Sequence, residues 1–191
     1  MTEPKLIPEL AGYRARFHEA DCEVRRTVEM CTQESFNMQP DAGAWSAGQC
    51  LHHLIISGQQ THRKIAAAVE AAETSGPFHD GPFRYGFISR LFVRSMQPDF
   101  ALHIPAPKTY HPAGDPLDPE AVMADFSVLQ AALVAVTERA NGLDLKRIRV
   151  PSPLTDWLKL SLGAWLAAVA GHQERHLKQA REALRAVEDT A

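Results

Sequence analysis

Apolar residues recur at steps of three and four along four long stretches of this chain, which is the spacing of one face of an α-helix. The first two stretches cover about residues 8–34 and 46–74. The third covers residues 118–142 and the fourth residues 161–188. No stretch shows a convincing strand pattern, and no internal repeat is visible. The pattern therefore predicts an all-α protein.

The ends of these stretches carry residues that are typical of helix starts. Ser46 and Gln49 form an S-x-x-Q capping box, in which each side chain satisfies an amide of the first turn. Asp118 suits the capping position of the third helix and Pro119 its first helical position. Ser161 stands at the corresponding place before the fourth helix. Three of the four helices thus have a marked beginning.

The connections between the stretches predict how the helices are arranged. A short turn region joins the first two helices, so we expect them to be antiparallel neighbours. Helices 2 and 3 are separated by the proline-rich residues 75–117, which include a short helical pattern at 84–94. A connection of this length can cross a bundle and let two helices run parallel. We predict one domain, residues 1–191, folded as a four-helix bundle with a long crossover connection between helices 2 and 3.

Composition narrows the class of protein. With 191 residues, 45% of them apolar and 23% charged, the chain suits one ordinary soluble domain. Its net charge is −3 and no basic stripe is interleaved with aromatic residues, so we expect no nucleic-acid partner. Three cysteines without a C-x-x-C motif indicate reduced thiols in the cytoplasm. The longest nearly apolar run, residues 162–171, is about half a membrane span, so we expect no membrane partner.

Candidate chemistry centres on two histidines, His172 and His176, in the fourth helix. At a spacing of four residues, both rings lie on one helical face and can reach one metal ion. They fall within or at the edge of the apolar face, so they should point toward the bundle interior. A zinc protease of the H-E-x-x-H type needs a glutamate directly after the first histidine, but this chain has Gln173 there, and Glu174 faces another side. Two core histidines with buried partners remain the alternative to a metal site.

A catalytic zinc-like site needs a third protein ligand and an open coordination position. The second helix offers two neighbouring histidines, His52 and His53, close to its beginning. They flank the apolar stripe of that helix on opposite sides, so periodicity does not choose between them. Two histidines at the solvent edge remain the alternative.

Three segments together resemble the DinB-like (YfiT-like) superfamily. A W-S-x6-H-L motif begins at Trp45 and places its histidine at position 53, which resembles the family's second-helix signature. An H-x3-H-L-x-Q motif that begins at His172 is similar to its C-terminal signature. The segment APKTYHP, residues 106–112, resembles its central loop. The three matches cover nearly the whole chain in order and spacing.

The resemblance implies a four-helix bundle that holds one divalent metal ion through His53, His172 and His176. It favours His53 over His52 because the histidine falls eight residues after the tryptophan. Histidine-only ligation suits zinc, nickel, iron or cobalt. Members of the family include thiol S-transferases that use low-molecular-weight thiols, and proteins labelled metal-dependent hydrolases.

These expectations predict a metal-dependent enzyme, a thiol S-transferase or a hydrolase, that acts on a small-molecule substrate. Either a water or a low-molecular-weight thiol would be activated at the open position. A non-catalytic metal- or ligand-binding bundle, or an interaction module, is the alternative. The apolar helices also allow a homodimer, although no residue indicates an interface.

The remaining candidates have weaker patterns. Cys50 is predicted to be a small buried thiol. Side chains of the long connection could line the mouth of a pocket beneath it, and so could two residues before the fourth helix; they are His79, His103, Tyr110 and His111, and Asp156 and Trp157. Plain solvent exposure is the alternative for the three histidines. A basic face on the fourth helix is predicted to be solvated and paired with Glu174 and Glu182; it consists of Arg175, Lys178, Arg181 and Arg185.

Overall fold

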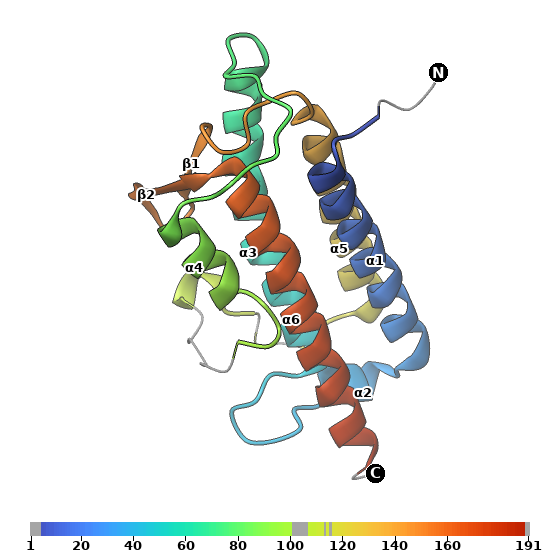
Figure 1. The fold of residues 1–191 in the computed structure, drawn as a ribbon. Helices are drawn as coiled ribbons and strands as arrows, with labels where there is room; N and C mark the ends of the chain where they lie inside the picture. Colours follow the sequence, from blue (N-terminus) through green and yellow to red (C-terminus); the bar gives the residue numbers. More distant parts are fainter. Residues whose placement is uncertain (1–4, 101–106, 113, 115, 190–191) are drawn as a thin grey trace.

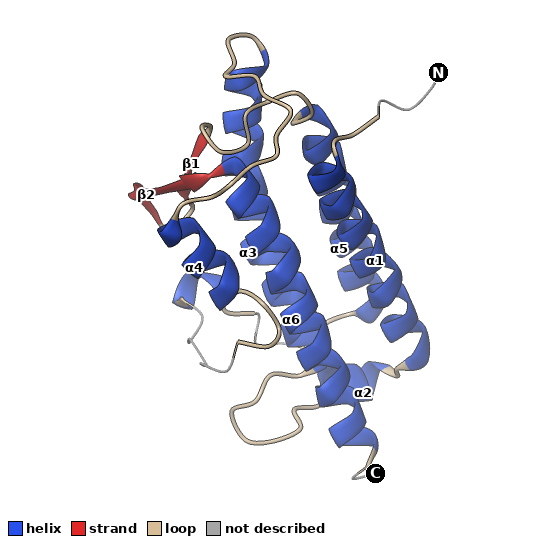
Figure 2. Cartoon of the chain, viewed as in Figure 1, coloured by secondary structure: helices blue, strands red, loops and turns tan. Residues whose placement is uncertain are grey.

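The computed structural model describes residues 5–100, 107–112, 114 and 116–189. These ranges contain six α-helices, one turn of 3₁₀ helix and a two-stranded sheet, and helices dominate the molecule (Figures 1 and 2). The prediction of a mostly helical protein is confirmed. The prediction that it has no strands is wrong.

Four long helices lie side by side and make up most of the molecule (Figure 1). They are α1 (Pro8–Met30), α3 (Ala47–Glu73), α5 (Pro119–Arg139) and α6 (Leu162–Glu188). Both α1 and α3 pack against α5 and α6. Helices α1 and α3 are not among the pairs of described elements in substantial contact, so they lie across the bundle from each other. The prediction that the first two helices are neighbours is wrong, because the chain between them is long enough to cross the end of the bundle.

Contacts between α3 and α5 show that these two helices run parallel. Glu73 at the end of α3 pairs with Arg139 at the end of α5, with a separation of 2.8 Å. Earlier in both helices, Gly58 lies against the side chain of Leu129. The connection between them therefore carries the chain back along the bundle before α5 begins.

The first predicted helix, residues 8–34, is divided in two. Helix α1 ends at Met30, and a short helix, α2 (Gln33–Asn37), follows it. The side chain of Thr32 accepts a hydrogen bond from the amide of Ser35, and the hydroxyl of Ser35 accepts one from the amide of Thr32. This local bonding starts a new helix instead of continuing the first one, and periodicity alone does not reveal it.

The predicted starts of α3 and α5 are confirmed. At α3, the Ser46 hydroxyl accepts from the Gln49 amide, and the Gln49 side chain accepts from the Ser46 amide, both at 3.1 Å. At α5, the Asp118 carboxylate accepts from the amide of Glu120 at 3.1 Å. Ser161 occupies the capping position of α6, but its hydroxyl makes no capping hydrogen bond.

A β-hairpin directly precedes α6. Its strands, β1 (Arg149–Ser152) and β2 (Thr155–Ser161), are antiparallel, and the buried residues Val150 and Leu160 pair across it. Pro151 lies inside β1, where it has no amide hydrogen for the ladder. A four-residue strand with a central proline has no recognisable sequence pattern, which explains why the hairpin was not predicted.

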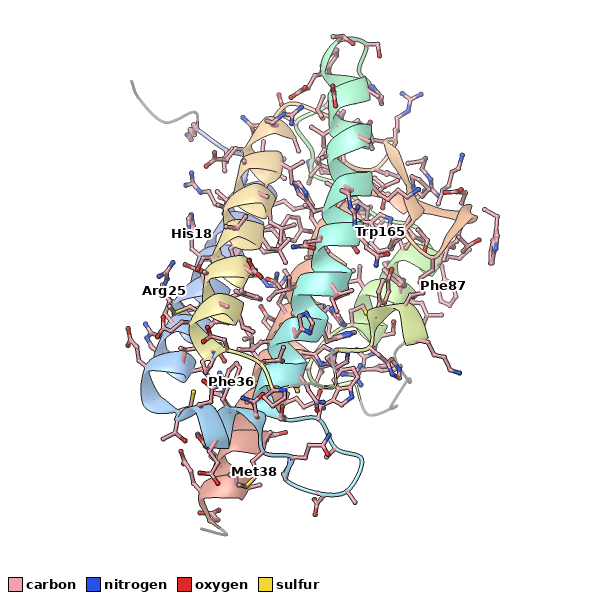
Figure 3. All side chains as sticks on the ribbon, turned by 180° about the vertical axis from the view of Figure 1, so that it is seen from behind. His18, Arg25, Phe36, Met38, Phe87 and Trp165 are labelled. Atoms are coloured by element: carbon pink, nitrogen blue, oxygen red, sulfur yellow. The ribbon has the colours of Figure 1, made fainter. Side chains whose placement is uncertain are left out.

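The connection between α3 and α5 contains α4 (Phe87–Ser95), so the short helix predicted at 84–94 is confirmed with shifted bounds. Helix α4 packs on α6 and lies beside the hairpin (Figure 1). Gly163 of α6 permits the close approach of this connection, because a Cβ at that position would clash with the hydroxyl of Tyr85. Phe87 is 77% exposed and projects away from the bundle (Figure 3).

Buried apolar residues form two clusters along the bundle. The cluster nearer the hairpin includes Phe17, Ile65, Leu133 and Leu166. The cluster nearer α2 includes Val24, Phe36, Leu54, Phe126 and Leu177. On α6 the first cluster ends at Ala170 and the second begins at Leu177, so the two candidate histidines of this helix lie between them.

Within the described residues, α5 is the one helix long and apolar enough to cross a membrane by length and composition. It packs against α1 and α3 inside the bundle. Core helices commonly meet the same criterion, and the buried residues of α5 include Phe126, Leu129 and Leu133.

Candidate metal centre

Three histidines from two helices meet between α3 and α6. His53 lies near the beginning of α3, and His172 and His176 lie one turn apart in the middle of α6. One ring nitrogen of each lies within 4.8 Å of the other two. Among the described residues, these three side chains form a group of possible metal ligands. The histidines indicated by the sequence are thus brought together, and the group could hold a metal ion.

Hydrogen bonds at Nδ1 orient two of the three rings. His53 Nδ1 donates to the carbonyl oxygen of Tyr110 at 2.7 Å, and His176 Nδ1 donates to Oε1 of Gln179 at 2.9 Å. A neutral imidazole carries one hydrogen, so each of these rings keeps an unprotonated Nε2. Metal-binding histidines usually have an acceptor of this kind on the nitrogen that does not bind the metal.

The spacing of the ring nitrogens fits a shared ion. Nε2 of His53 lies 3.3 Å from Nε2 of His172. Two nitrogens bound tetrahedrally to one ion at about 2.0–2.1 Å would lie roughly 3.4 Å apart. The observed pair therefore has the separation of two ligands.

Burial keeps the rings neutral. It lowers the pKa of His53; the hydrogen bond to Tyr110 opposes this change and the nearby His111 adds to it. Burial lowers the pKa of His172 well below its ordinary value, and the neighbouring histidines and Arg175 lower it further. The side chain of His172 is partly exposed to solvent. Neutral imidazole is the form that binds a metal ion.

Aromatic rings enclose one side of the group. The ring of Trp45 lies 4.9 Å from that of His53 and 6.0 Å from that of His176. Tyr110 is the last residue of the 3₁₀ turn η1 (Lys108–Tyr110), and its side chain is buried. The residues that begin α3 and the crossover connection thus form an apolar wall beside the histidines.

The structure distinguishes His53 from its neighbour. His53 is 2% exposed and belongs to the group, whereas His52 is half-buried and does not. Cys50, one turn before His53, is fully buried, and burial raises the pKa of its thiol to about 12. The prediction of a buried thiol is confirmed, and a thiol with this pKa remains protonated and unreactive near neutral pH.

The histidines of the connection lie in different places. His111 follows Tyr110, with its ring 6.1 Å from that of Trp45, so it lies near the group. His79 lies beyond the opposite end of α3 and lines a separate cavity. His103 is outside the described residues.

Two further candidates, Asp156 and Trp157, lie on β2. Asp156 is exposed and pairs with Lys64 at 3.2 Å, and Trp157 is 82% exposed. Neither belongs to the histidine group.

The basic face of α6 is only partly as predicted. Lys178 pairs with Glu182 on the same helix at 3.8 Å. Glu174 instead pairs with Arg16 of α1 at 2.6 Å, and Arg175 donates to the carbonyl oxygen of Ser95 at 3.2 Å. Arg181 also reaches α1, where it pairs with Glu23. Helix α1 packs directly on α6, so partners on it compete with partners on α6 itself.

Sequence reasoning missed the backbone carbonyl of Tyr110 as a partner of His53. No side-chain pattern can indicate a carbonyl contributed by a distant turn. The pairing of His176 with Gln179 could have been found, because a spacing of three residues places both on one helical face.

Comparison with known proteins agrees with this geometry. The sequence profile described as the DinB superfamily matches residues 16–180. The chain is also similar to the uncharacterized protein YuaE of Bacillus subtilis (strain 168), with 24% identity over 166 residues, 87% of this chain and 93% of that protein. No solved structure matches the chain.

Proposed function

The chain belongs to the DinB superfamily, and on that premise we propose that His53, His172 and His176 hold one divalent metal ion in a small metal-dependent enzyme. The observation that carries the proposal is the convergence of the three rings, two of which have Nδ1 engaged by an oxygen. We further propose that the four long helices are the four-helix bundle of the family, with the connection between α3 and α5 as its crossover.

A divalent ion held by three protein ligands retains an open position, where it lowers the pKa of a thiol or a water. Other residues of the chain would orient the ligands and shield that position from water. Tyr110 and Gln179 hold the His53 and His176 rings with Nε2 free, and Trp45 and Tyr110 exclude water from one side. Because the three ligands are neutral, they leave the charge of the ion undiminished.

We propose thiol transfer as the reaction in preference to hydrolysis. Among the described residues, no carboxylate belongs to the histidine group, whereas Arg175 lies close enough to lower the pKa of His172. Hydrolysis benefits from a general base that positions and deprotonates water, whereas a thiolate needs no further base once it is formed. The positive charge of Arg175 near His172 also favours an anionic nucleophile. The proposed substrates are a low-molecular-weight thiol and a small electrophile.

Metal content tests the site. We expect about one equivalent of divalent metal in the native protein and a loss of it in the His53→Ala and His172→Ala variants, because each removes one of three ligands. The matched control is His52→Ala, which removes the neighbouring half-buried histidine and should retain the metal. Elemental analysis of the purified proteins provides the measurement. Full occupancy in His172→Ala would refute the assignment.

The reaction is tested on metal-loaded protein with a panel of thiols and a chromogenic electrophile, next to an ester substrate without thiol. Thiol-dependent turnover that disappears in His172→Ala would support the transferase. Ester hydrolysis without thiol would favour a hydrolase. Metal without turnover of either kind would favour the second candidate, a non-catalytic metal-binding bundle.

A further inference from the structure

A cavity lies beyond the end of α3 that is opposite the histidines. It has a volume of about 370 Å³ and is lined by His79, Pro82, Phe83, Arg84, Asp144, Lys146 and Arg147. Twenty residues of α3 separate His53 from Glu73, the last residue of the helix. At 1.5 Å per residue this is about 30 Å. The cavity is therefore separate from the candidate metal centre.

Two chain segments form this cavity, and backbone hydrogen bonds join them. The amide of His79 donates to the carbonyl of Gly142 at 3.0 Å, and the amide of Asp144 donates to the carbonyl of Pro77 at 2.8 Å. An antiparallel bridge pairs Phe78 with Leu143 between them. The side chains contributed by the two segments are thus held next to one another.

Three cationic side chains line the cavity without an acidic partner in the described part of the chain. They are Arg84, Lys146 and Arg147, all of them exposed. None has a side-chain hydrogen bond or ion pair with a described residue, whereas most other arginines of the helices do. Three uncompensated cations around one cavity repel one another, and an anion between them would remove that repulsion.

The one carboxylate in the lining is already engaged. Asp144 is buried, and its Oδ1 accepts from the amides of Lys146 and Arg147, both at 3.0 Å. It therefore shapes the turn that carries these two cations. Asp80 lies in the other segment but does not line the cavity.

His79 adds a donor to the lining. Its Nδ1 accepts a hydrogen bond from the amide of Gly81 at 2.8 Å, so the neutral ring carries its hydrogen on Nε2. Apart from the buried Asp144 carboxylate, the polar side chains of the lining then all offer hydrogen-bond donors. Such a lining suits an anion with several acceptor oxygens, and arginine binds phosphate particularly well.

We propose that this cavity binds the phosphate group of a small phosphorylated molecule, through Arg84, Lys146 and Arg147. The cavity is larger than one phosphate needs, and Phe83 and Pro82 supply apolar surface for an organic substituent. The same chemistry also accepts free phosphate, so the experiment separates the two ligands. Because the site is remote from the histidines, it serves regulation or attachment of the protein and not the proposed reaction.

Titration calorimetry with inorganic phosphate and with phenyl phosphate, at constant ionic strength on metal-free protein, tests this proposal. We expect saturable one-site binding that is weakened about tenfold or more in Arg84→Gln and in Arg147→Gln, because each variant loses a charge-assisted hydrogen bond. Arg84 and Arg147 are both exposed, so the fold should be retained in these variants. Arg185→Gln, on the far part of α6, is the matched control and should bind like the native protein.

The comparison of the two ligands, and the binding of phosphate by the His172→Ala variant, distinguish the remaining possibilities. Tighter binding of phenyl phosphate than of inorganic phosphate supports a phosphorylated organic ligand. Equal or weaker binding of phenyl phosphate would show that the apolar lining does not favour the organic substituent, and would overturn that part of the proposal. His172→Ala should leave phosphate binding unchanged, and loss of binding in that variant would place the anion at the metal centre instead. Unchanged binding in both Arg84→Gln and Arg147→Gln, or an equal loss in Arg185→Gln, would refute the site.

Discussion

At the candidate metal centre, burial favours the neutral form of His53 and His172, and the three imidazoles lie close together. Burial is the largest cause of the lowered pKa of both His53 and His172. Neutral rings can approach to 3.3 Å without charge repulsion, which protonated rings could not do. The same burial makes the metal-free protein sensitive to acid.

We expect the free energy of unfolding of the metal-free protein to fall as the pH decreases below about 6.5, the pKa of an unfolded histidine. In this range the unfolded chain binds protons that the buried His172 does not accept, because its folded-state pKa is lowered. The loss continues until the pH reaches that lowered pKa. Each group contributes up to about 1.4 kcal/mol per pH unit.

Urea unfolding at about pH 7.5 and about pH 5.5 measures this effect, with His172→Gln as the comparison. The variant lacks one buried titrating group, so its stability should depend less on pH. An identical pH dependence in the two proteins would show that His172 does not cause the acid sensitivity.

At the scale of secondary-structure elements, glycine decides how closely α2 packs on the beginning of α3. Gly48 lies in the first turn of α3, and Phe36 of α2 is fully buried against it near the end of the bundle (Figure 3). A Cβ at Gly48 would come within 2.7 Å of the Phe36 ring and within 3.2 Å of its carbonyl oxygen. The ring and the backbone of α2 would both have to move.

We therefore expect Gly48→Ala to lower the free energy of unfolding by about 1–3 kcal/mol, the usual cost of overpacking. The matched control is Gly12→Ala in α1, where a Cβ would meet nothing within 4 Å. This control should raise stability by up to about 1 kcal/mol, because alanine favours the helix. Chemical denaturation of both variants provides the measurement, and a stabilised Gly48→Ala protein would contradict the packing argument.

At the scale of the whole molecule, four polar side chains are buried between the long helices, close to where the two apolar clusters meet. They are Ser57, Thr61, Gln130 and Gln173. Ser57 and Thr61 donate to carbonyls of their own helix, but the amide groups of Gln130 and Gln173 have no hydrogen-bond partner in the described structure. Unsatisfied buried amides lower stability, and each such group costs about 1–3 kcal/mol.

Replacement of one of these amides should therefore stabilise the protein. We expect Gln130→Met, which preserves the length of the side chain, to raise the free energy of unfolding by about 1 kcal/mol or more. Thr137→Val on the same helix is the control: its hydroxyl donates to the carbonyl of Leu133 at 2.7 Å, so this variant should lose about 0.5–1.5 kcal/mol. Thermal unfolding of both proteins tests the pair. A destabilised Gln130→Met protein would show that interior water satisfies the amide.

Much of the local structure was predictable because it depends on residues one or two turns apart. The four long helical patterns, the capping box at Ser46 and the shared face of His172 and His176 all follow from spacing along the chain. The break after Met30 was missed even though its cause is local, because the Thr32 box interrupts an apolar pattern that continues through it.

The composition of the site and the arrangement of the helices depend on tertiary contacts. These contacts join residues that are far apart in the sequence, so spacing along the chain does not reveal them. Periodicity left His52 and His53 equivalent, and the packing of α3 on α6 placed His53 in the site. The carbonyl of Tyr110, 57 residues away along the chain, fixes the tautomer of that ring. Long-range packing likewise put α1 across from α3, because the chain between them, which includes α2, is long enough to cross the end of the bundle.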